Sequence, residues 1–317
     1  MSTEKEVADE FEAKIKNLPR EKNLVNDVHL YYYQGCWIPD LICSGVFSSE
    51  RNFMARDDDI ILSSCPKSGT TWLKALLFSI VNRTYLFALA DNNPLLKVNP
   101  HELVPFIYHS QSLNIETIPP PRLLATHLLY DLLPPSIKTS SCKIVYVSRN
   151  PMDQFISLWH FSCKLKGAEA EPHHLEECFD RFCRGIHAFG PFWDHVLGYW
   201  KASLERPHKI LFLKYEELKK DTASNIKKLA EFLELPFSED EEKQGVVEEI
   251  LTLCSLENLK NLAANKNGTT RTGFPNSAYF RKGEVGDWKN FLTASMVERM
   301  EKIMKEKFGK YNFSFES

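Results

Sequence analysis

The chain has 317 residues, of which 43% are hydrophobic and 26% are charged, and these proportions are ordinary for a globular enzyme. Its formal net charge of −3 provides no general attraction for nucleic acid or for an anionic membrane, so an anionic ligand would need a local group of lysines and arginines. No uninterrupted apolar run approaches the ~20 residues that span a bilayer. We therefore expect neither a nucleic-acid partner nor a membrane partner.

The eight cysteines are spread along the chain, and only Cys178 and Cys183 are close together. Without a C-x-x-C pair, this spacing favours neither a zinc site nor a disulfide framework, so we expect reduced thiols and no metal. The N-terminus is charged and lacks the apolar segment that follows in a secretory signal peptide. Together these features predict a cytoplasmic protein.

Residues 1–30 are predicted to form a helix followed by an arm. Val7, Phe11 and Ile15 recur at four-residue spacing, which indicates a short amphipathic helix that ends before Pro19. An aromatic stretch follows between residues 31 and 37. Its side chains could pack in the core or line a pocket for an apolar ligand, and the sequence leaves both possibilities open.

Four short apolar runs are predicted to be buried strands of one sheet. Helical patterns separate most of them, and this alternation favours right-handed crossovers and a mainly parallel sheet that helices cover on both faces. In this architecture ligands bind beyond the carboxyl ends of the strands. Candidate ligand residues run through most of the chain, so we expect a single α/β domain over residues 1–317. The four predicted strands are residues 60–64, 122–126, 143–148 and 209–214.

The first of these runs leads into a short loop with the features of a phosphate cradle. Lys67 supplies a point charge, Gly69 lets the backbone approach a ligand closely, and the following helix start offers free N–H groups. The lysine precedes the glycine, unlike in a Walker A loop, so the site could work without Mg²⁺. Taken alone, the segment also fits an ordinary strand-to-helix loop with a capping threonine. The predicted cradle comprises Lys67, Ser68, Gly69, Thr70 and Thr71.

Two further strand ends carry candidate functional side chains. Arg149 lies just before a predicted helix, where its planar guanidinium could bind a phosphate or form a surface salt bridge. His127 follows another strand, where an imidazole could take a proton from an attacking hydroxyl, although a lone histidine is more often structural. Its position beside the phosphate loop favours the catalytic role. No such setting is recognised for His101, His109 or the pair at 173–174.

The C-terminal third carries three further features. Ser238 and Glu241 form a capping box for one continuous helix. Residues 263–278 have no periodicity and are expected to form a mobile loop. Beyond them, Arg281 and Lys282 precede two closely spaced glycines. This pattern is typical of a second anion-binding loop, and the alternative is a solvated pair of charges.

Four segments, taken together, closely resemble the motifs of the cytosolic sulfotransferases. Their order and spacing match this family, and the resemblance extends from about Tyr31 to the C-terminus. Residues 190–200 are similar to the plant branch of the family. The resemblance implies a phosphate-loop architecture like that of nucleotide kinases. The four segments are residues 66–72, Thr126 with His127, residues 146–153 with Ser157, and residues 280–289.

The family transfers a sulfuryl group from 3′-phosphoadenosine 5′-phosphosulfate to a hydroxyl or an amine. By this resemblance, residues 67–71 would hold the 5′-phosphosulfate, Trp72 would stack on adenine and Tyr215 would contact the base. The resemblance also implies a binding site for the 3′-phosphate, which selects this donor over ATP. That site would comprise Arg149, Ser157, Arg281, Lys282 and Gly283.

The resemblance also implies the roles of three residues in the reaction. His127 would deprotonate the acceptor hydroxyl, which attacks sulfur in line with the leaving oxygen. Lys67 would stabilise the negative charge that develops on that oxygen. Ser157 would restrain Lys67 until the acceptor binds, which would limit wasteful hydrolysis. No metal is required.

The chain departs from the animal members of the family at three places. Ala125 stands where many of them have a lysine two residues before the histidine, so transition-state charge would depend more on the loop lysine and backbone donors. Leu256, after Ser255, replaces a phenylalanine that packs on adenine, and we expect weaker stacking there. Ala294 replaces a valine in residues 289–298, which resemble a dimerisation motif. We therefore expect a monomer or a weak homodimer.

The predicted function is sulfuryl transfer to a hydroxyl of a small, partly apolar plant metabolite. Candidate acceptors are a flavonoid, a steroid-like hormone, a hydroxyjasmonate and a desulfoglucosinolate. Two other classes stay open, a non-catalytic nucleotide-binding protein of the same fold and a small-molecule kinase that uses ATP. The missing Walker glycine and the extra cations at residues 281–282 disfavour the kinase. Aromatic side chains are expected to line the acceptor pocket, among them Trp37, Tyr108, Trp159 and Phe161.

Overall fold

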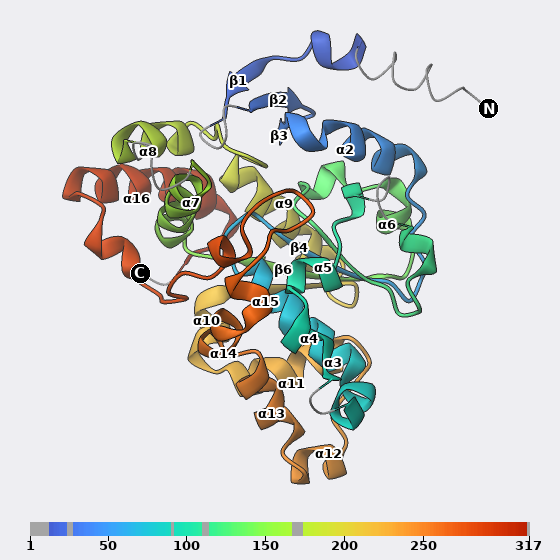
Figure 1. The fold of residues 1–317 in the computed structure, drawn as a ribbon. Coiled ribbons are helices and arrows are strands. Elements are labelled where there is room, and N and C mark those ends of the chain that lie inside the picture. The colour runs from blue at the N-terminus through green and yellow to red at the C-terminus, as the bar shows by residue number, and fades with distance from the viewer. Residues whose placement is uncertain (1–12, 24–27, 90–91, 110–113, 167–173, 316–317) are drawn as a thin grey trace.

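A parallel sheet of four strands forms the centre of the molecule (Figure 1). The strand order is β5-β4-β6-β7, and each neighbouring pair is parallel, which confirms the predicted α/β fold. The strands are β4 (Ile60–Ser64), β5 (Leu123–Thr126), β6 (Lys143–Ser148) and β7 (Ile210–Lys214), within one residue of the predicted bounds. The structure is a computed structural model, and it describes residues 13–23, 28–89, 92–109, 114–166 and 174–315.

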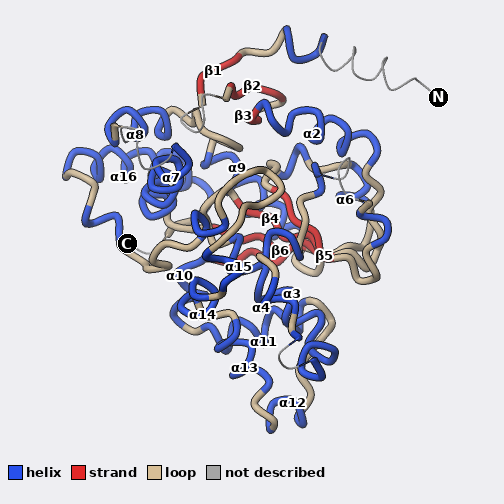
Figure 2. Tube along the Cα trace, viewed as in Figure 1, coloured by secondary structure: helices blue, strands red, loops and turns tan. Residues whose placement is uncertain are grey.

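Helices cover both faces of this sheet because the strands are apolar on both faces. Ile60 and Leu62 of β4 pack with α3 (Thr70–Leu89), whereas Ile61 between them packs with α9 (Phe192–Glu205) on the other face. This division follows from the period of two along a strand, which sends neighbouring side chains to opposite sides. Figure 2 shows the strands in the middle of the molecule with helices around them.

The connections between the central strands are helical, as parallel crossovers require. Helix α3 follows β4, α6 precedes β6, and α7, α8 and α9 separate β6 from β7. The remaining helices are α2 (Asp40–Asn52), α4 (Pro94–Lys97), α5 (Pro100–Leu103), α6 (Pro135–Thr139), α7 (Pro151–Lys166), α8 (Leu175–Cys183), α10 (Tyr215–Lys220), α11 (Thr222–Phe232), α12 (Glu239–Lys243), α13 (Val246–Leu253), α14 (Leu256–Asn261), α15 (Ala263–Lys266) and α16 (Ala294–Phe308). The 3-10 turns are η2 (Ile107–His109), η3 (Ile115–Thr117), η4 (Tyr130–Leu132), η5 (Asn276–Tyr279), η6 (Asp287–Asn290) and η7 (Gly309–Tyr311).

The N-terminal region contributes a small antiparallel sheet of β1 (Arg20–Lys22), β2 (His29–Tyr33) and β3 (Cys36–Pro39). Most of the aromatic stretch lies in β2 and β3, where Tyr33 is buried in the core. The backbone of Trp37 bonds to residues 189 and 190, which fastens β3 to the loop before α9. Residues 13–16 are helical, whereas Val7 and Phe11 of the predicted N-terminal helix lie outside the described residues.

Two predictions for the C-terminal third need correction. The capping box of Ser238 and Glu241 is confirmed, but the helix is not continuous. Gly245 has φ +77°, which ends α12, and α13 then begins at Val246. Residues 263–278 are not irregular throughout, because α15 and η5 lie at their two ends and Thr269 pairs with Pro275 between them. The mobility expected of this segment stays a prediction.

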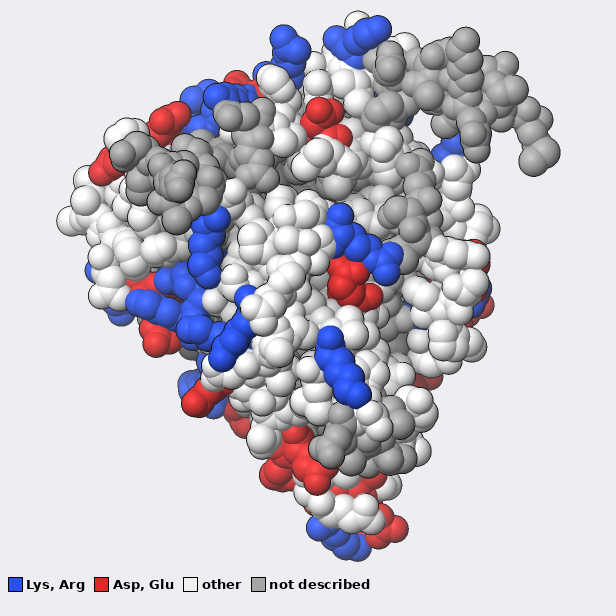
Figure 3. All heavy atoms as spheres, viewed as in Figure 1, with Lys and Arg blue, Asp and Glu red and all other residues white. Residues whose placement is uncertain are grey.

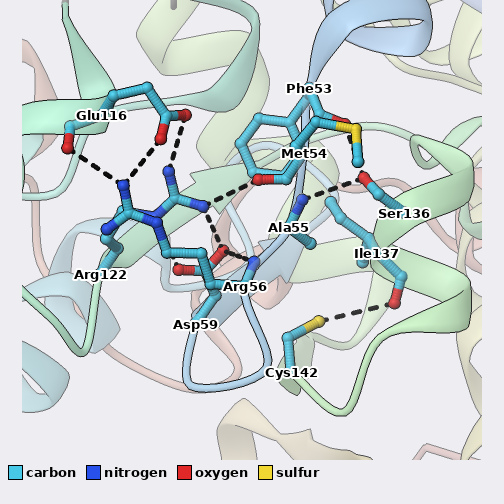
Figure 4. A network of polar contacts seen from close by, with 10 residues as sticks. All are labelled: Phe53, Met54, Ala55, Arg56, Asp59, Glu116, Arg122, Ser136, Ile137 and Cys142. Carbon is cyan, nitrogen blue, oxygen red and sulfur yellow. Dashed lines mark hydrogen bonds and ion pairs between the residues drawn. The ribbon is translucent and has the colours of Figure 1, made fainter.

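A buried ion pair ties the amino ends of β4 and β5 together (Figure 4). Arg122 donates two hydrogen bonds of 2.7 Å to Asp59, and both side chains are fully buried. A further nitrogen of Arg122 donates to Glu116, and the Arg56 N–H donates to Asp59. The network lies at the opposite end of the strands from their carboxyl ends, so we assign it to folding stability.

The surface seen from the direction of Figure 1 carries charges of both signs. Figure 3 shows Lys and Arg groups on this face, several of them next to Asp and Glu groups, with uncharged surface between them. Within the described ranges, no helix has both the length and the apolar character that crossing a membrane requires. The same residues contain no group of three or more His, Cys, Asp or Glu side chains arranged to hold a metal ion.

Candidate active site

The carboxyl ends of the four central strands border one cavity of about 650 Å³. Each strand is followed by a residue that lines this cavity, as the parallel topology predicts. The cavity walls also include residues from α7, α14 and the segment between α15 and η6. The residues that follow the strands are Lys67 after β4, His127 after β5, Arg149 after β6 and Tyr215 after β7.

The phosphate loop between β4 and α3 has a backbone that depends on glycine. Gly69 has φ +109°, and a Cβ atom there would lie 2.8 Å from the ring of Tyr215. The hydroxyls of Ser64 and Thr70 lie 2.7 Å apart, which joins the end of β4 to the start of α3. Gln154 of α7 donates a hydrogen bond of 2.6 Å to the backbone oxygen of Pro66. The loop is therefore held from three sides in a conformation that exposes its backbone to the cavity.

Lys67 is the charged residue of this loop, and other cations lie near it. Its Nζ lies 4.0 Å from the ring centroid of Phe161, close enough for a cation–π contact. Burial, together with the nearby charges of Arg149, Arg281 and Lys164, lowers the pKa of Lys67 to about 7. An anionic ligand would offset this repulsion, so the loop is suited to a phosphate or a sulfate group.

His127 is held in the tautomer that a general base needs. Its Nδ1 lies 2.6 Å from the backbone oxygen of Ser64, which can only accept, so Nδ1 carries the ring proton. The backbone oxygen of His127 lies 3.0 Å from Nε2 of His195, and Nδ1 of His195 lies 2.9 Å from the hydroxyl of Tyr146. Burial lowers the pKa of His127 to about 3, and the hydrogen bond to Ser64 only partly opposes this shift. Nε2 of His127 is therefore unprotonated at neutral pH and free to accept a proton.

Arg149, Arg281 and Lys282 form a second group of cations in the site. Arg149 is only 5% exposed, packs its guanidinium 4.6 Å from the ring centroid of Tyr215 and donates a 2.6 Å hydrogen bond to the backbone oxygen of Glu284. Arg281 and Lys282 both bind the carboxylate of Asp287, with 2.7 Å between Lys282 Nζ and Oδ1. Burial would raise the pKa of Asp287, but the bonds from these two cations outweigh it and lower the pKa. The pair at 281–282 is thus anchored and not simply solvated.

Most of the donor residues predicted from the resemblance line two adjoining cavities, but Ser68 lines neither of them. Arg281, Gly283 and Leu256 line both the first cavity and a second one of about 1040 Å³, which Lys282 also lines. Ser157 of α7 and Trp72 of α3 line the first cavity, and Trp72 meets Tyr215 edge to face with 5.6 Å between ring centroids. Ser255 lines neither cavity, because its hydroxyl accepts a hydrogen bond from the N–H of Asn258 and caps α14.

Only some of the residues predicted to contact the acceptor line the first cavity. Tyr108 lines the first cavity and stacks on Phe106, with ring centroids 5.1 Å apart, and Phe161 lines it from α7. Trp37 and Trp159 do not line the cavity. Trp37 packs on Tyr32 within the N-terminal sheet, and Trp159 packs on Phe291. Trp159 therefore packs against the core, and Trp37 belongs to the N-terminal sheet.

Several cavity residues could not be recognised from the sequence. Phe106 and Phe189 both pack against His127, with ring centroids 4.7 and 5.2 Å from the imidazole. His101, which was given no part in the site, lines the cavity and lies 2.8 Å from the hydroxyl of Thr71. The only signal in the sequence was the Asn-Pro pair before His101, which predicts the start of a short helix. Other cavity residues without a sequence signal are His109, Lys164, Arg271, Phe274 and Tyr279.

Unpartnered donors indicate what kind of ligand fits these cavities. Ser68 is fully buried, yet its hydroxyl has no hydrogen-bond partner in the part of the chain that the structure describes. The same holds for Nε of Arg149 and Nε of Arg281. All three atoms can donate hydrogen bonds, and a buried donor without a partner is costly. Ser68 lines neither cavity, so its hydroxyl is not assigned to a ligand. Arg149 and Arg281 do line the first cavity and fit an anionic group there, and Lys67 fits another at the loop.

Comparison with known proteins agrees with this geometry. A family model described as a sulfotransferase domain matches residues 57–312. Cytosolic sulfotransferase 12 of Arabidopsis thaliana is 45% identical to the chain, over 99% of this chain and 96% of that protein. Flavonol 4'-sulfotransferase of Flaveria chlorifolia is also 45% identical, over 97% of each protein.

Solved structures show the same relationship. The crystal structure titled as an Arabidopsis thaliana "putative steroid sulphotransferase" matches with a TM-score of 0.77 and 40% identity, over 100% of this chain and 99% of that chain. Mouse sulfotransferase SULT7A1 complexed with PAP matches with a TM-score of 0.69 and 28% identity, over 88% of this chain and 94% of that chain. The prediction of a sulfotransferase is confirmed, and the chain belongs to the sulfotransferase family, with its high identities among the plant cytosolic members.

Proposed function

We propose that this sulfotransferase moves the sulfuryl group of 3′-phosphoadenosine 5′-phosphosulfate to a hydroxyl of a small, partly apolar metabolite. The structural relative SULT7A1 was solved with PAP, the product of that donor, 3′-phosphoadenosine 5′-phosphate. Two groups of cations, at Lys67 and at Arg149 with Arg281, suit the two anionic ends of this nucleotide. ATP has no 3′-phosphate to meet the second group. The chain's own residues would thus bind and orient the donor without a metal.

The observation that carries the proposal is the position of His127 beside the phosphate loop. The imidazole is bonded to the backbone oxygen of Ser64, the last residue of the strand that leads into that loop. In the proposed step, the acceptor oxygen forms a bond to sulfur while its proton passes to Nε2 of His127. The bond between sulfur and the bridging phosphate oxygen breaks, and Lys67 stabilises the charge on the departing phosphate.

The acceptor would lie against the aromatic wall around His127. Phe106, Tyr108 and Phe189 offer flat apolar surfaces that suit a planar ring system bearing a hydroxyl. One relative is named for a flavonol acceptor and one structural neighbour for a steroid. We propose a flavonoid or a steroid-like molecule as the acceptor class, with a hydroxyjasmonate as a smaller candidate. As the relatives are named cytosolic, we propose that the protein acts in the cytoplasm.

Our proposal for the oligomeric state rests on residues 289–298. Ala294 begins α16, and Thr293 caps this helix by accepting a 3.3 Å hydrogen bond from the Met296 N–H. The hydroxyl of Thr293 is used within its own helix, and Ala294 offers less apolar surface than the valine of the animal motif. We propose a monomer or a weak homodimer on this basis.

Calorimetric titration with PAP tests the donor site before any acceptor is known. We expect tight binding that does not change when Mg²⁺ is removed and that excess ATP does not reverse. Binding of ATP with Mg²⁺ in place of PAP would point to a kinase. An acceptor panel with the sulfuryl donor then tests catalysis, and PAP binding without any sulfated product would favour a non-catalytic nucleotide-binding protein.

A further inference from the structure

Lys74 is a buried cation directly behind the wall of the active site. It lies on α3 one turn after Thr71, so the two side chains share a face of the helix. Its side chain is fully buried, and among the described residues no carboxylate lies within ion-pair distance of it. Lys74 Nζ lies 2.6 Å from the backbone oxygen of Val104 and 3.7 Å from the ring centroid of Phe106.

His101 connects Lys74 to the phosphate loop. Nδ1 of His101 lies 3.2 Å from Lys74 Nζ, and Nε2 of the same ring lies 2.8 Å from the hydroxyl of Thr71. Thr71 and His101 both line the cavity, whereas Lys74 does not. The ring of Tyr279 covers His101 with 4.2 Å between centroids, so the imidazole is held between two elements. The three side chains form one chain of hydrogen bonds that leads from the core to the predicted phosphate cradle.

The charge of Lys74 decides the direction of these hydrogen bonds. An ammonium group has only donors, so His101 must accept at Nδ1 and carry its proton on Nε2. Nε2 then donates to Thr71, whose own hydroxyl proton is free to turn toward the loop. A neutral amine removes this constraint, because Nδ1 of His101 could then donate to Lys74 and the hydroxyl of Thr71 could donate to Nε2. In that case Thr71 would present only lone pairs to an anion.

We propose that Lys74 is a positioning residue for the donor, which acts through the tautomer of His101 to keep the hydroxyl of Thr71 as a hydrogen-bond donor to the 5′-phosphosulfate. This inference rests on the proposed function. It assigns a role to a cation that no motif includes, in a chain that has Ala125 where many animal relatives carry a lysine.

The surroundings of Lys74 fit this role. Burial lowers the pKa of Lys74 well below its ordinary value, and the carboxylate of Glu102 opposes that shift. The negative charge of a bound phosphosulfate would also oppose it, so the proposed role requires the ammonium form in the donor complex. Burial, with Lys74, His127, Lys67 and His109 adding to it, lowers the pKa of His101 well below its ordinary value, so the ring is neutral. A neutral ring has a tautomer to select, which a charged imidazolium would not.

A two-bond ¹H–¹⁵N correlation spectrum of histidine-labelled protein in complex with PAP tests the inference directly. The signal of His101 is identified by its absence from the His101→Gln variant. We expect the Nε2-protonated tautomer in the unchanged protein and a shift toward the other tautomer in Lys74→Met, which keeps an unbranched side chain and removes the amine. An Nδ1-protonated His101 in the unchanged protein would overturn the inference even if the variant failed to fold.

PAP affinities provide the second readout. Loss of one hydrogen bond to a charged group predicts about a tenfold weaker PAP affinity for Lys74→Met. His101→Gln puts an amide donor near the position of Nε2, so adding Lys74→Met to this variant should change affinity by less than about twofold. Adding it to Thr71→Val should have the same small effect. An equal loss in all three backgrounds would overturn the inference, because Lys74 would then act by its charge alone. Absence of PAP binding by the unchanged protein would overturn the proposed function, and this inference with it.

Discussion

Nδ1 of His127 lies 2.6 Å from the backbone oxygen of Ser64, so the proposed base is fastened to the strand that ends in the phosphate loop. The distance between base and loop is therefore set by the pairing of β4 with β5, in which Ser63 lies opposite Thr126. Without this hydrogen bond, the imidazole would depend on the rotamer preference of the side chain, and the ring would be held less firmly. This arrangement leads to predictions for the base, the loop lysine, the arginines and the distant ion pair.

Replacing His127 with alanine should remove turnover of a hydroxyl acceptor and leave the affinity for PAP nearly unchanged. Loss of a general base typically costs 10²- to 10⁴-fold, and the donor contacts of the loop remain. Steady-state kinetics and calorimetry measure the two effects separately. His208→Ala, an exposed histidine, is the matched control and should behave as the unchanged protein. A His127→Ala variant that kept full turnover would mean that another group takes the proton.

The affinity for PAP should fall as the pH rises above about 7, because Lys67 has a pKa of about 7 and must be charged to hold the anion. The slope should approach about tenfold per pH unit until the raised pKa of the complex is reached. Below pH 7 the affinity should level off. Calorimetric titrations from pH 6 to about 9 measure this dependence, and Lys67→Met should flatten it.

The pH dependence of folding stability tests the lowered pKa of Lys67 in a second way. The pKa of Lys67 is lowered in the folded protein, so above about pH 7 the unfolded chain binds more protons than the folded one. The contribution of Lys67 to the free energy of unfolding should therefore rise with pH from about 7 toward the ordinary pKa of lysine. Denaturant unfolding of the unchanged protein and of Lys67→Met at several pH values compares the two slopes. Equal slopes would contradict the lowered pKa.

Arg149→Gln should weaken PAP binding by about tenfold or more while leaving the binding of adenosine 5′-phosphosulfate, which has no 3′-phosphate, little changed. The reason is that Arg149, which lines the cavity together with Arg281, is a predicted ligand of the 3′-phosphate and is not part of the loop. Competition titrations with the two nucleotides measure the difference. Arg184→Gln removes an exposed arginine and serves as the control. Equal losses for both nucleotides would mean that Arg149 holds the fold of the site and not the 3′-phosphate.

Asp59→Asn should lower the free energy of unfolding by about 3–5 kcal/mol, because it leaves the buried charge of Arg122 without its partner. Glu116→Gln alters the exposed end of the same network and should cost less than about 1 kcal/mol. Chemical denaturation of both variants gives the comparison. Folded Asp59→Asn protein should bind PAP normally, because this network lies at the other end of the strands.

The sequence alone determined the four central strands and the residues that follow them. Runs such as residues 60–64 are apolar on both faces, which only a covered parallel strand accommodates, and the topology then brings Lys67, His127 and Arg149 to one edge. The split at Gly245 was missed because a capping box marks where a helix begins and does not mark where it ends. The short helix α15 was missed for another reason, because it has only 4 residues and no side-chain cap to mark its start.

Only the tertiary structure decided which side chains surround the cavity and how their protons are arranged. Trp37 and Tyr108 look alike as aromatic residues, yet Tyr108 lines the cavity from η2 and Trp37 packs on Tyr32 within the N-terminal sheet, because the place of each residue in the fold and not composition sets the direction of its ring. The hydrogen bond from His127 to Ser64 and the contacts of Lys74 with His101 join residues far apart in the chain. Such contacts depend on distances that folding sets, so local patterns identified the chemical groups and packing determined their tautomers and charges.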